Sequence, residues 1–264
     1  MLKISNSSNT FNPGTINEKK ALTDLSLHLA KGDFVTILGS NGAGKSTLFN
    51  AIAGTFPVDR GTITLDGKNI TSLPDYKRSK FIGRMFQDPL KGTAPTMTIE
   101  ENLALAYMRA SSGTNPFSVI SKADRAEFRQ RLSQLGLGLE DRMGSPVGLL
   151  SGGQRQALTL LMATMVTPKL LLLDEHTAAL DPATADKVLT LTRQIVADHG
   201  ITCLMITHNI PSALSLGNRT IMMKDGSIVL ELGGAQREGL TPEELLRLFH
   251  QQGISNDRIE LSAE

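Results

Sequence analysis

One stretch of nine residues, 39–47, constrains this chain more than any other. Its sequence, GSNGAGKST, fits the pattern G-x-x-x-x-G-K-[ST], and residues 33–38 before it have the composition of a buried β-strand. Glycines at this spacing let successive backbone N–H groups turn inward around a polyphosphate. A helix that begins at the end of the loop directs its positive dipole end at the same charge. The sequence therefore predicts a strand, a glycine-rich loop and a helix that together bind a nucleoside triphosphate.

Two side chains of this loop have specific expected roles. We expect Lys45 to reach the β- and γ-phosphates, and the hydroxyl of Ser46 to ligate Mg²⁺. A chance glycine turn before a helix is the alternative reading, and the strand–loop–helix context argues against it. The predicted nucleotide-binding residues of the loop are Gly39, Ser40, Asn41, Gly42, Ala43, Gly44, Lys45, Ser46 and Thr47.

Composition narrows the classes of partner. The 264 residues can hold one large domain, with or without an insertion. Because 27 basic residues are balanced by 26 acidic ones, the chain has no net positive potential that would indicate nucleic-acid binding. Cys203 is the only cysteine, so no intramolecular disulfide can form. The longest apolar stretch, 157–166, is far shorter than the roughly 20 residues that cross a bilayer, and no apolar run follows Lys3 as in a signal peptide. If the protein works at a membrane, we expect it to dock to another chain.

Strand patterns dominate the first 90 residues. Residues 1–30 predict two strands around the turn Asn12-Pro13-Gly14, and residues 47–53 predict a short helix closed by Gly54. Two further strands are expected at 61–67, which ends in an Asp-Gly turn, and at 80–85.

From about residue 90 the pattern becomes helical. Thr98 and Glu101 form a predicted capping box, and Phe128, Leu132 and Leu135 recur at helical spacing. Residues 111–116 are expected to form a loop. This helical block, roughly 90–160, is predicted to be an insertion in a strand-rich protein.

Strands resume after residue 160. The run at 169–174 is apolar and ends in an acid, as expected of a parallel strand buried on both faces. We expect a helix from Asp181-Pro182 to Gly200 with Val188, Leu191 and Ile195 on its apolar side. The remaining predictions are a buried strand at 201–206, a hairpin at 220–231, an amphipathic helix from Thr241 with Leu245, Leu248 and Phe249, and a polar tail from about Gly253.

A pair of acids completes a candidate phosphate site. Asp174 ends the apolar run, and Glu175 follows it directly. We expect Asp174 to hold Mg²⁺ and Glu175 to orient or deprotonate an attacking water. An apolar run followed by two acids is common by chance, but in a chain that also has the phosphate loop it is a strong signal of a phosphate site.

A further segment, Leu150-Ser151-Gly152-Gly153-Gln154, precedes an apolar helix, and with the phosphate loop it resembles the signature of ABC transporter nucleotide-binding subunits. Other marks of that family follow in order: Gln87 for the Q-loop, Asp181 for the D-loop and His208 for the switch histidine. The resemblance implies an α/β fold with a P-loop NTPase (RecA-like) core, an N-terminal antiparallel β subdomain and an inserted α-helical subdomain. It implies one ABC ATP-binding domain over 1–264, with 1–89 and 161–232 as core and β subdomain, 90–160 as helical signature subdomain and 233–264 as C-terminal helix and tail.

The resemblance also implies roles for single residues. The catalytic set would be Glu175, His208, Lys45 and Gln87, and the magnesium ligands Ser46, Gln87 and Asp174. Ser151, Gly152, Gly153 and Gln154 would complete the site of a second copy in an ATP-sandwich homodimer, because a capped helix N-terminus attracts anions. Asp181 can be only an N-cap or can also bridge the two copies. Phe11 corresponds to the aromatic residue that stacks on adenine, although a buried strand residue is the alternative.

One position departs from the family pattern. His176 follows Glu175, where the family usually has Pro or another small residue. The imidazole either tunes the proton balance near the γ-phosphate or only packs. Neither reading removes a catalytic group.

The implied function is ATP hydrolysis that powers a separate integral membrane permease, with ATP and Mg²⁺ as cofactors. The resemblance further implies a bacterial importer at the cytoplasmic face of the membrane, an extracytoplasmic substrate-binding protein, and no nucleic acid. The sequence from Asp174 to Pro182 resembles that of an ABC subgroup whose members work with binding proteins for amino acids, aromatic ones among them. The alternative is a soluble ABC ATPase outside transport. A non-hydrolysing regulatory module is a third reading, against which Lys45, Asp174, Glu175 and His208 argue.

Overall fold

The computed structural model describes residues 1–110 and 120–253 and divides into two compact units. Unit 1 joins Met1–Arg78 to the chain from Thr202 onward, and unit 2 is Ser79–Ile201. The loop predicted at 111–116 and the polar tail after Gly253 lie outside the described residues. The predicted subdivision into core, helical subdomain and tail stays a prediction, since the units follow other boundaries.

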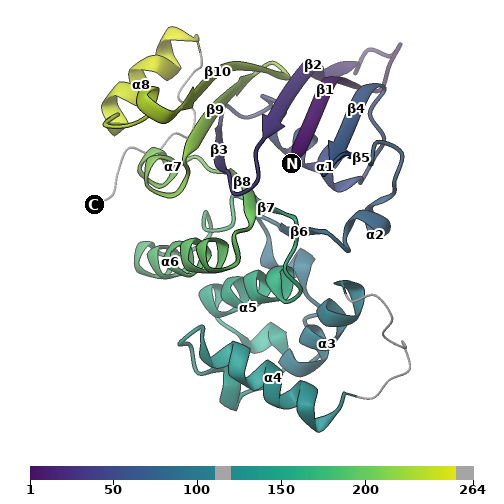
Figure 1. Ribbon diagram of the computed structural model, residues 1–264, viewed down its shortest axis with the longest axis vertical. Helices are drawn as coiled ribbons and strands as arrows, with labels where there is room; N and C mark the ends of the chain where they lie inside the picture. The colour runs from purple at the N-terminus through teal and green to yellow at the C-terminus, as the bar shows by residue number, and fades with distance from the viewer. Residues whose placement is uncertain (111–119, 254–264) are drawn as a thin grey trace. The chain divides into compact units, whose positions relative to one another are not determined.

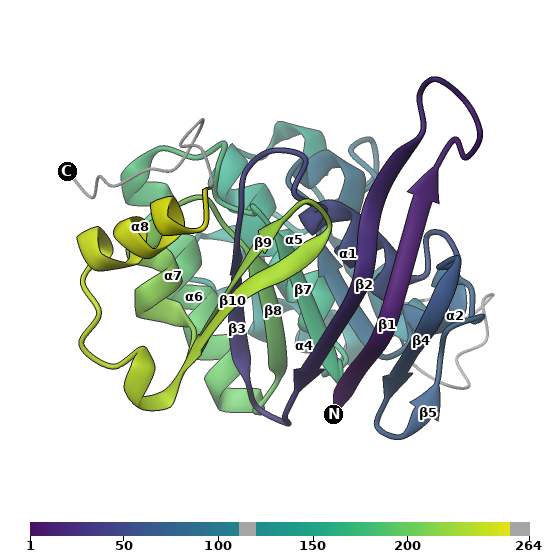
Figure 2. The ribbon, with the colours of Figure 1, turned by 90° about the horizontal axis from the view of Figure 1, so that it is seen from above.

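Unit 1 contains strands of two sheets (Figures 1 and 2). Its elements are β1 (Leu2–Phe11), β2 (Lys19–Leu29), β3 (Phe34–Leu38), α1 (Lys45–Ala53), β4 (Arg60–Leu65), β5 (Lys68–Asn69), α2 (Asp75–Arg78), β8 (Thr202–Ile206), α7 (Ile210–Leu216), β9 (Arg219–Lys224), β10 (Ser227–Gly233) and α8 (Pro242–Gln251). One sheet has the antiparallel order β2-β1-β4-β5. In the other, β3 lies between β8 and β9 and is parallel to both, and β10 pairs antiparallel with β9.

The pairing in unit 1 follows from its sequence pattern. Every residue of β3 and β8 is buried, as expected of a parallel strand with both faces covered. β1 and β2 alternate buried and exposed positions and form the long hairpin seen in Figure 2. On the other side of the unit, Leu245 and Phe249 of α8 bury their side chains with Ile210 and Ala213 of α7.

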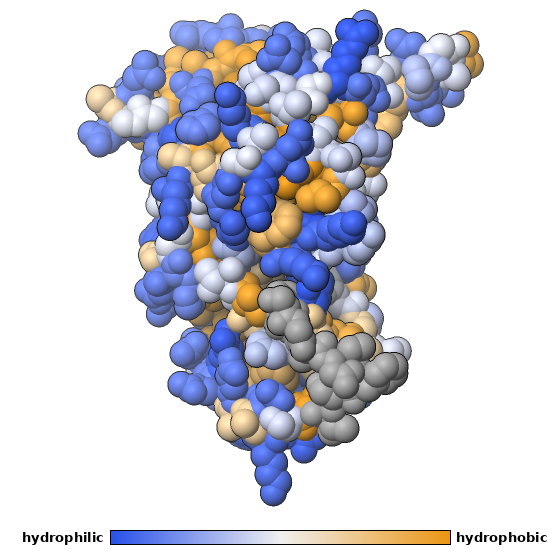
Figure 3. Space-filling view, turned by 45° about the vertical axis from the view of Figure 1, so that its right-hand side comes forward, coloured by the Kyte–Doolittle hydropathy of each residue, from blue (hydrophilic) through white to orange (hydrophobic). Residues whose placement is uncertain are grey.

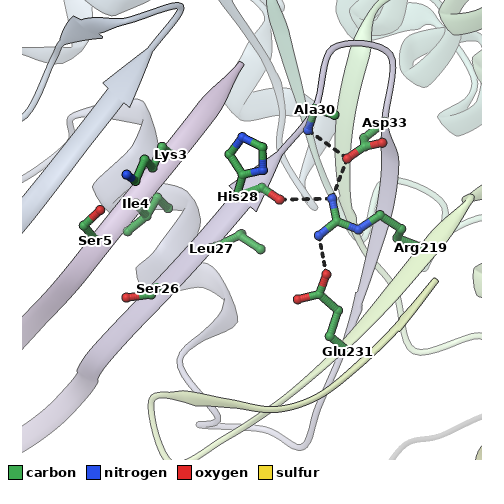
Figure 4. A pocket seen from close by; sticks show the side chains of 10 residues that line it. All are labelled: Lys3, Ile4, Ser5, Ser26, Leu27, His28, Ala30, Asp33, Arg219 and Glu231. Carbon is green, nitrogen blue, oxygen red and sulfur yellow. Dashed lines mark hydrogen bonds and ion pairs between the residues drawn. The ribbon is translucent and has the colours of Figure 1, made fainter.

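Arg219 ties the start of β3 to the hairpin of β9 and β10 (Figure 4). Its guanidinium donates to the carboxylates of Asp33 and Glu231 and to the carbonyl of His28, which is 3.0 Å away. Burial alone would raise the pKa of Asp33. Hydrogen bonds from the Ala30 amide and from Arg219 outweigh that effect and hold the pKa below its usual value. This cluster lines a shallow cavity of about 730 Å³.

A second buried arginine closes the other end of α1. Arg78 is 1% exposed, and one of its nitrogens donates to the carbonyls of Ala51 and Ile52 at 2.8 Å. The last carbonyls of a helix have no partner within the helix, so this side chain supplies donors that the sequence of α1 lacks. Burial lowers the pKa of Arg78, and the hydrogen bonds compensate the buried charge.

Unit 2 is mostly helical. Its elements are β6 (Ile82–Met85), α3 (Ile99–Ala110), α4 (Lys122–Ser133), α5 (Gly152–Thr164), β7 (Leu170–Asp174) and α6 (Pro182–His199), with short 3-10 turns at Pro89–Gly92, Leu139–Asp141 and Val147–Leu149. β6 and β7 pair in parallel. Phe128, Leu132 and Leu135 enter one core with residues of α3 and α5, as their spacing predicts.

The apolar face of α6 differs from the prediction. The buried residues of α6 are Val188, Thr192 and Val196, whereas Ile195 is half-buried and Leu191 packs at the edge of the core. The i, i+4, i+8 stripe therefore runs through Thr192. Its hydroxyl donates to the carbonyl of Val188 at 2.8 Å and so can be buried in a helix.

Hydrophilic side chains cover most of the face drawn in Figure 3. Among the described residues, the large apolar side chains that are exposed are Phe11, Ile16, Tyr76, Leu90, Leu105 and Leu149. Across residues 1–110 and 120–253, no helix has the length and apolar character needed to span a bilayer.

Candidate nucleotide site

The phosphate loop joins β3 to α1 in unit 1. Gly44 is the N-cap of α1, with φ of 100° and no side-chain hydrogen bond to the first amides of the helix. A Cβ at this position would lie 2.5 Å from the carbonyl oxygen of Ala21, so only glycine fits against β2. The N-terminal amides of α1 therefore receive no cap from Gly44, as suits an anion site.

Lys45 is folded onto this loop. Its ammonium donates to the carbonyl oxygens of Gly39 at 2.6 Å and Ser40 at 3.0 Å, and its side chain is buried. These two carbonyls hold the positive charge at the loop. Ser46 comes next in the first turn of α1 and is exposed, so its hydroxyl is accessible to a ligand.

The structure places His208 at the same sheet edge as the phosphate loop. β3 and β8 are parallel neighbours with Ile37 opposite Ile206, and the amide of Thr207 donates to the carbonyl of Ile37 at 3.2 Å. The carboxyl ends of both strands thus meet at one edge, where ligands of α/β folds bind. His208 is half-buried there, one residue before Asn209 caps α7.

Phe11 is the last residue of β1 and is 39% exposed. Its ring meets that of Phe56 edge to face, with centroids 5.5 Å apart. The alternative interpretation, that Phe11 is a buried strand residue, is therefore wrong. A half-exposed ring can accept a base, and adenine stacking stays a prediction.

In unit 2 the two predicted acids end β7. Glu175 has φ of 44°, a conformation that costs a residue with a Cβ about 1 kcal/mol or more. The amide nitrogen of Gln87 donates to a carboxylate oxygen of Glu175 at 2.9 Å, although 88 residues separate them. The fold therefore brings Gln87 into contact with Glu175, the residue directly after Asp174.

Arg84 is a neighbour of this acidic pair that the sequence analysis missed. Its guanidinium lies 3.9 Å from the carboxylate of Asp174 and 4.5 Å from the ring centroid of Phe86. Burial lowers the pKa of Arg84, and the charge of Asp174 partly restores it. The sequence signal that could have identified Arg84 is its position as a basic residue inside the apolar strand at 82–85.

His176 is buried and neutral. Burial lowers its pKa to about 4. Its Nε2 lies 3.2 Å from the hydroxyl of Thr192, whose proton goes to Val188, so the imidazole donates this hydrogen bond. Of the two readings of this residue, the structure favours packing, here against α6.

The signature residues begin α5 with a capping box. The amide of Gln154 donates to the Ser151 hydroxyl at 3.3 Å, and the Ser151 amide donates to the Gln154 side chain at 3.2 Å. Because the box uses the amides of Ser151 and Gln154, the amides of Gly152 and Gly153 are the ones that a ligand can bind. Asp181 is the N-cap of α6 without a reciprocal box, and its carboxylate accepts from the Thr184 amide at 3.1 Å. Its pKa is lowered by the Thr184 side-chain and backbone hydrogen bonds.

Each predicted magnesium ligand, taken by itself, offers an oxygen atom, the kind of ligand that the hard cation Mg²⁺ prefers. Asp174 offers carboxylate oxygens and Ser46 an exposed hydroxyl. Because the amide nitrogen of Gln87 is engaged by Glu175, its amide oxygen is the atom available to a cation. As magnesium ligands, these three residues stay a prediction.

Comparisons with known proteins agree with this geometry. A family model described as ABC transporter matches residues 22–178. A tyrosine transport ATP-binding protein of Clostridioides difficile is 44% identical over 250 residues, 94% of this chain and 98% of that protein. An aliphatic sulfonates import ATP-binding protein of Agrobacterium fabrum is 36% identical over 81% of this chain and 74% of that one.

Solved structures give the same result for the fold. A dimeric ATP-binding cassette in a post-hydrolysis state with ADP and phosphate has a TM-score of 0.77 and 29% identity, covering 91% of this chain and all of that one. The ADP conformation of an ABC transporter cassette has a TM-score of 0.76 and 27% identity, covering 96% of each chain. The predicted α/β P-loop NTPase fold is confirmed, and the chain belongs to the ABC transporter family, as an ATP-binding subunit that hydrolyses ATP.

Proposed function

We propose that this chain is the ATPase subunit of an importer and powers a separate membrane permease for a small solute such as an amino acid. The observation that carries this proposal is the 44% identity to a tyrosine transport ATP-binding protein over nearly the whole of both chains. Names of other relatives, which include thiamine and methionine import ATP-binding proteins, support import as the direction. Aromatic amino acids are the substrate class that the first relative favours.

The residues divide the chemical work. Lys45 and the amides at the start of α1 bind the phosphates, and His208 donates to the γ-phosphate. Glu175 orients and deprotonates the attacking water, while Gln87 holds its carboxylate until substrate arrives. Ser46, Gln87 and Asp174 would hold Mg²⁺, which would supply positive charge to the phosphates. Phe11 stacks on the adenine.

A homodimer would complete the site. The amides of Gly152 and Gly153, with the Ser151 hydroxyl and Gln154, face an anion supplied by a second copy. Dimeric structures of a similar cassette support this arrangement. Asp181, besides capping α6, lies in the segment that would bridge the two copies.

The variant Glu175→Gln tests the ATPase and dimer together. It keeps the hydrogen-bonding shape but removes the base, so it should bind ATP and hydrolyse it at least about a hundredfold more slowly. It should then accumulate as a dimer with ATP, and stay monomeric with ADP, in size-exclusion chromatography with light scattering. A variant that binds ATP but stays monomeric at saturation would contradict the sandwich. The double variant with Lys45→Ala is the control and should not dimerise.

Capture from membranes tests the transport assignment. We expect tagged chain, recovered from gently solubilised membranes of its source, to bring one multi-spanning permease with it, as a peripheral subunit at the cytoplasmic face. The substrate-binding protein that works with that permease should bind tyrosine or a related amino acid in calorimetry. Recovery of soluble partners alone would instead favour an ABC ATPase that acts outside transport.

A further inference from the structure

We infer that Lys19 is a second cation of the nucleotide site, which contacts the α- and β-phosphates from the outer side of the loop. This inference rests on the proposed placement of the polyphosphate in the loop at 39–47. Nothing in the motif of that loop singles out Lys19, which lies 20 residues before it in the sequence.

The first observation is the position of the Lys19 ammonium. A Cβ built on Gly42 would lie 3.5 Å from Lys19 Nζ, and Nζ is the nearest atom that such a Cβ would meet. Gly42 itself is exposed. The ammonium therefore lies beside the exposed middle of the loop.

The second observation is that the backbone beneath Lys19 is fixed to the loop. Lys19 begins β2, and two residues later the carbonyl of Ala21 packs against Gly44. Gly226 joins these segments, because its amide donates to the carbonyl of Ala43 and its carbonyl accepts from the amide of Thr23, both at 3.0 Å. The backbone that carries Lys19 is therefore held beside the loop.

The third observation concerns charge. In the chain from 1 to 110 and from 120 to 253, no ion pair or side-chain hydrogen bond engages Lys19, which is exposed. The neighbouring acid, Glu18, instead accepts from the amide of Gly14 at 2.8 Å. Lys45, in contrast, is buried and bound to two carbonyls. The loop thus has one enclosed cation and one exposed cation.

The strand register indicates which phosphates Lys19 meets. Phe11 and Lys19 are directly opposite each other in the β1–β2 hairpin, so their side chains share a face. A nucleotide whose base stacks on Phe11 and whose terminal phosphates lie at Lys45 passes Lys19 between these points. Lys19 therefore contacts phosphates that ADP and ATP have in common.

Calorimetric titration with ADP tests the inference. Lys19→Ala should weaken ADP binding three- to tenfold, while Lys19→Arg stays within twofold of the parent. Lys20→Ala is the matched control, since Lys20 is exposed but projects to the other face of the strand, and it should also stay within twofold. Raising the salt concentration from 50 to 500 mM should shrink the Lys19→Ala effect because exposed charges are screened.

Competition by inorganic pyrophosphate separates a phosphate contact from a base contact. Pyrophosphate has no base, so Lys19→Ala should weaken its competition by the same factor as ADP binding. Equal ADP affinity in Lys19→Ala and parent, or an equal loss in Lys20→Ala, would overturn the role of Lys19. A parent protein that does not bind ADP would overturn the proposed site as a whole, so the two failures are distinguishable.

Discussion

Two helix N-termini, those of α1 and α5, are expected to bind phosphate, and the chain treats them in opposite ways. α1 begins after Gly44, whose left-handed backbone provides no cap. α5 begins after Ser151, whose capping box with Gln154 satisfies two amides. A glycine N-cap forgoes only about a few tenths of a kcal/mol relative to a serine cap, and a bound phosphate can return it. α1 is thus built to be completed by a ligand, whereas α5 is complete by itself and offers only two amides.

Loss of the Lys45 charge should have the largest effect. Lys45→Ala removes a buried cation from the α1 site, so we expect ATP affinity to fall by about 3 kcal/mol, roughly a hundredfold. Calorimetric titration measures it, with Lys31→Ala, a substitution of an exposed residue outside the loop, as the control. Unaltered binding by Lys45→Ala would show that the α1 N-terminus is not the nucleotide site.

Gly153 is required by packing at the start of α5, as Gly44 is at the start of α1. A Cβ at Gly153 would lie 2.1 Å from Cγ2 of Thr184, so only a glycine at this position lets α5 pack this closely on α6. Gly153→Ala should destabilise the fold by about 1–3 kcal/mol in urea denaturation. Adding Thr184→Ser removes the clashing methyl and should restore most of that loss. If Gly153→Ala alone were as stable as the parent, α5 and α6 could move apart at little cost in free energy.

The capping box allows a subtler comparison. Ser151→Ala should cost about 1 kcal/mol of stability and leave ADP affinity of the isolated subunit unchanged, because ADP binds at α1. Its ATPase rate should still fall, since α5 acts in the dimer. Thr98→Ala breaks the equivalent box of α3, where Glu101 is the partner, and should cost similar stability without slowing ATP hydrolysis. Equal ATPase rates in the two variants would argue against a role for Ser151 in trans.

Much of this contrast was readable from sequence, because caps and turns are local. Thr98 and Thr241 cap the helices that follow them and Gly54 closes α1, as predicted, whereas the cap that Ser121 gives α4 was not predicted. The hydrogen bond of Gln87 to Glu175 was not predictable, since no local pattern reports on a contact across 88 residues. For the same reason Thr192, not Ile195, faces the interior: the packing partner decides which side of α6 is buried.

The smallest effect should come from the end of β3 that is remote from the nucleotide. Because the pKa of Asp33 is lowered from its usual value of 3.8, the folded state favours the carboxylate. The stabilisation is therefore fully present above pH 3.8 and is lost as pH falls through the lower folded pKa. Asp33→Asn should reduce the unfolding free energy by less than about 1 kcal/mol at pH 7, since the pair with Arg219 is only partly buried.

Urea denaturation at a series of pH values checks this, and the gap between Asp33→Asn and the parent should close in acid. ADP affinity at pH 7 should stay within twofold. A gap that persists at low pH would show that the amide, and not the missing charge, disturbs the fold. A parallel loss of ADP affinity would show that β3 transmits strain from Asp33 to Gly39, so that the phosphate loop depends on both ends of its strand rather than on its own contacts with β2.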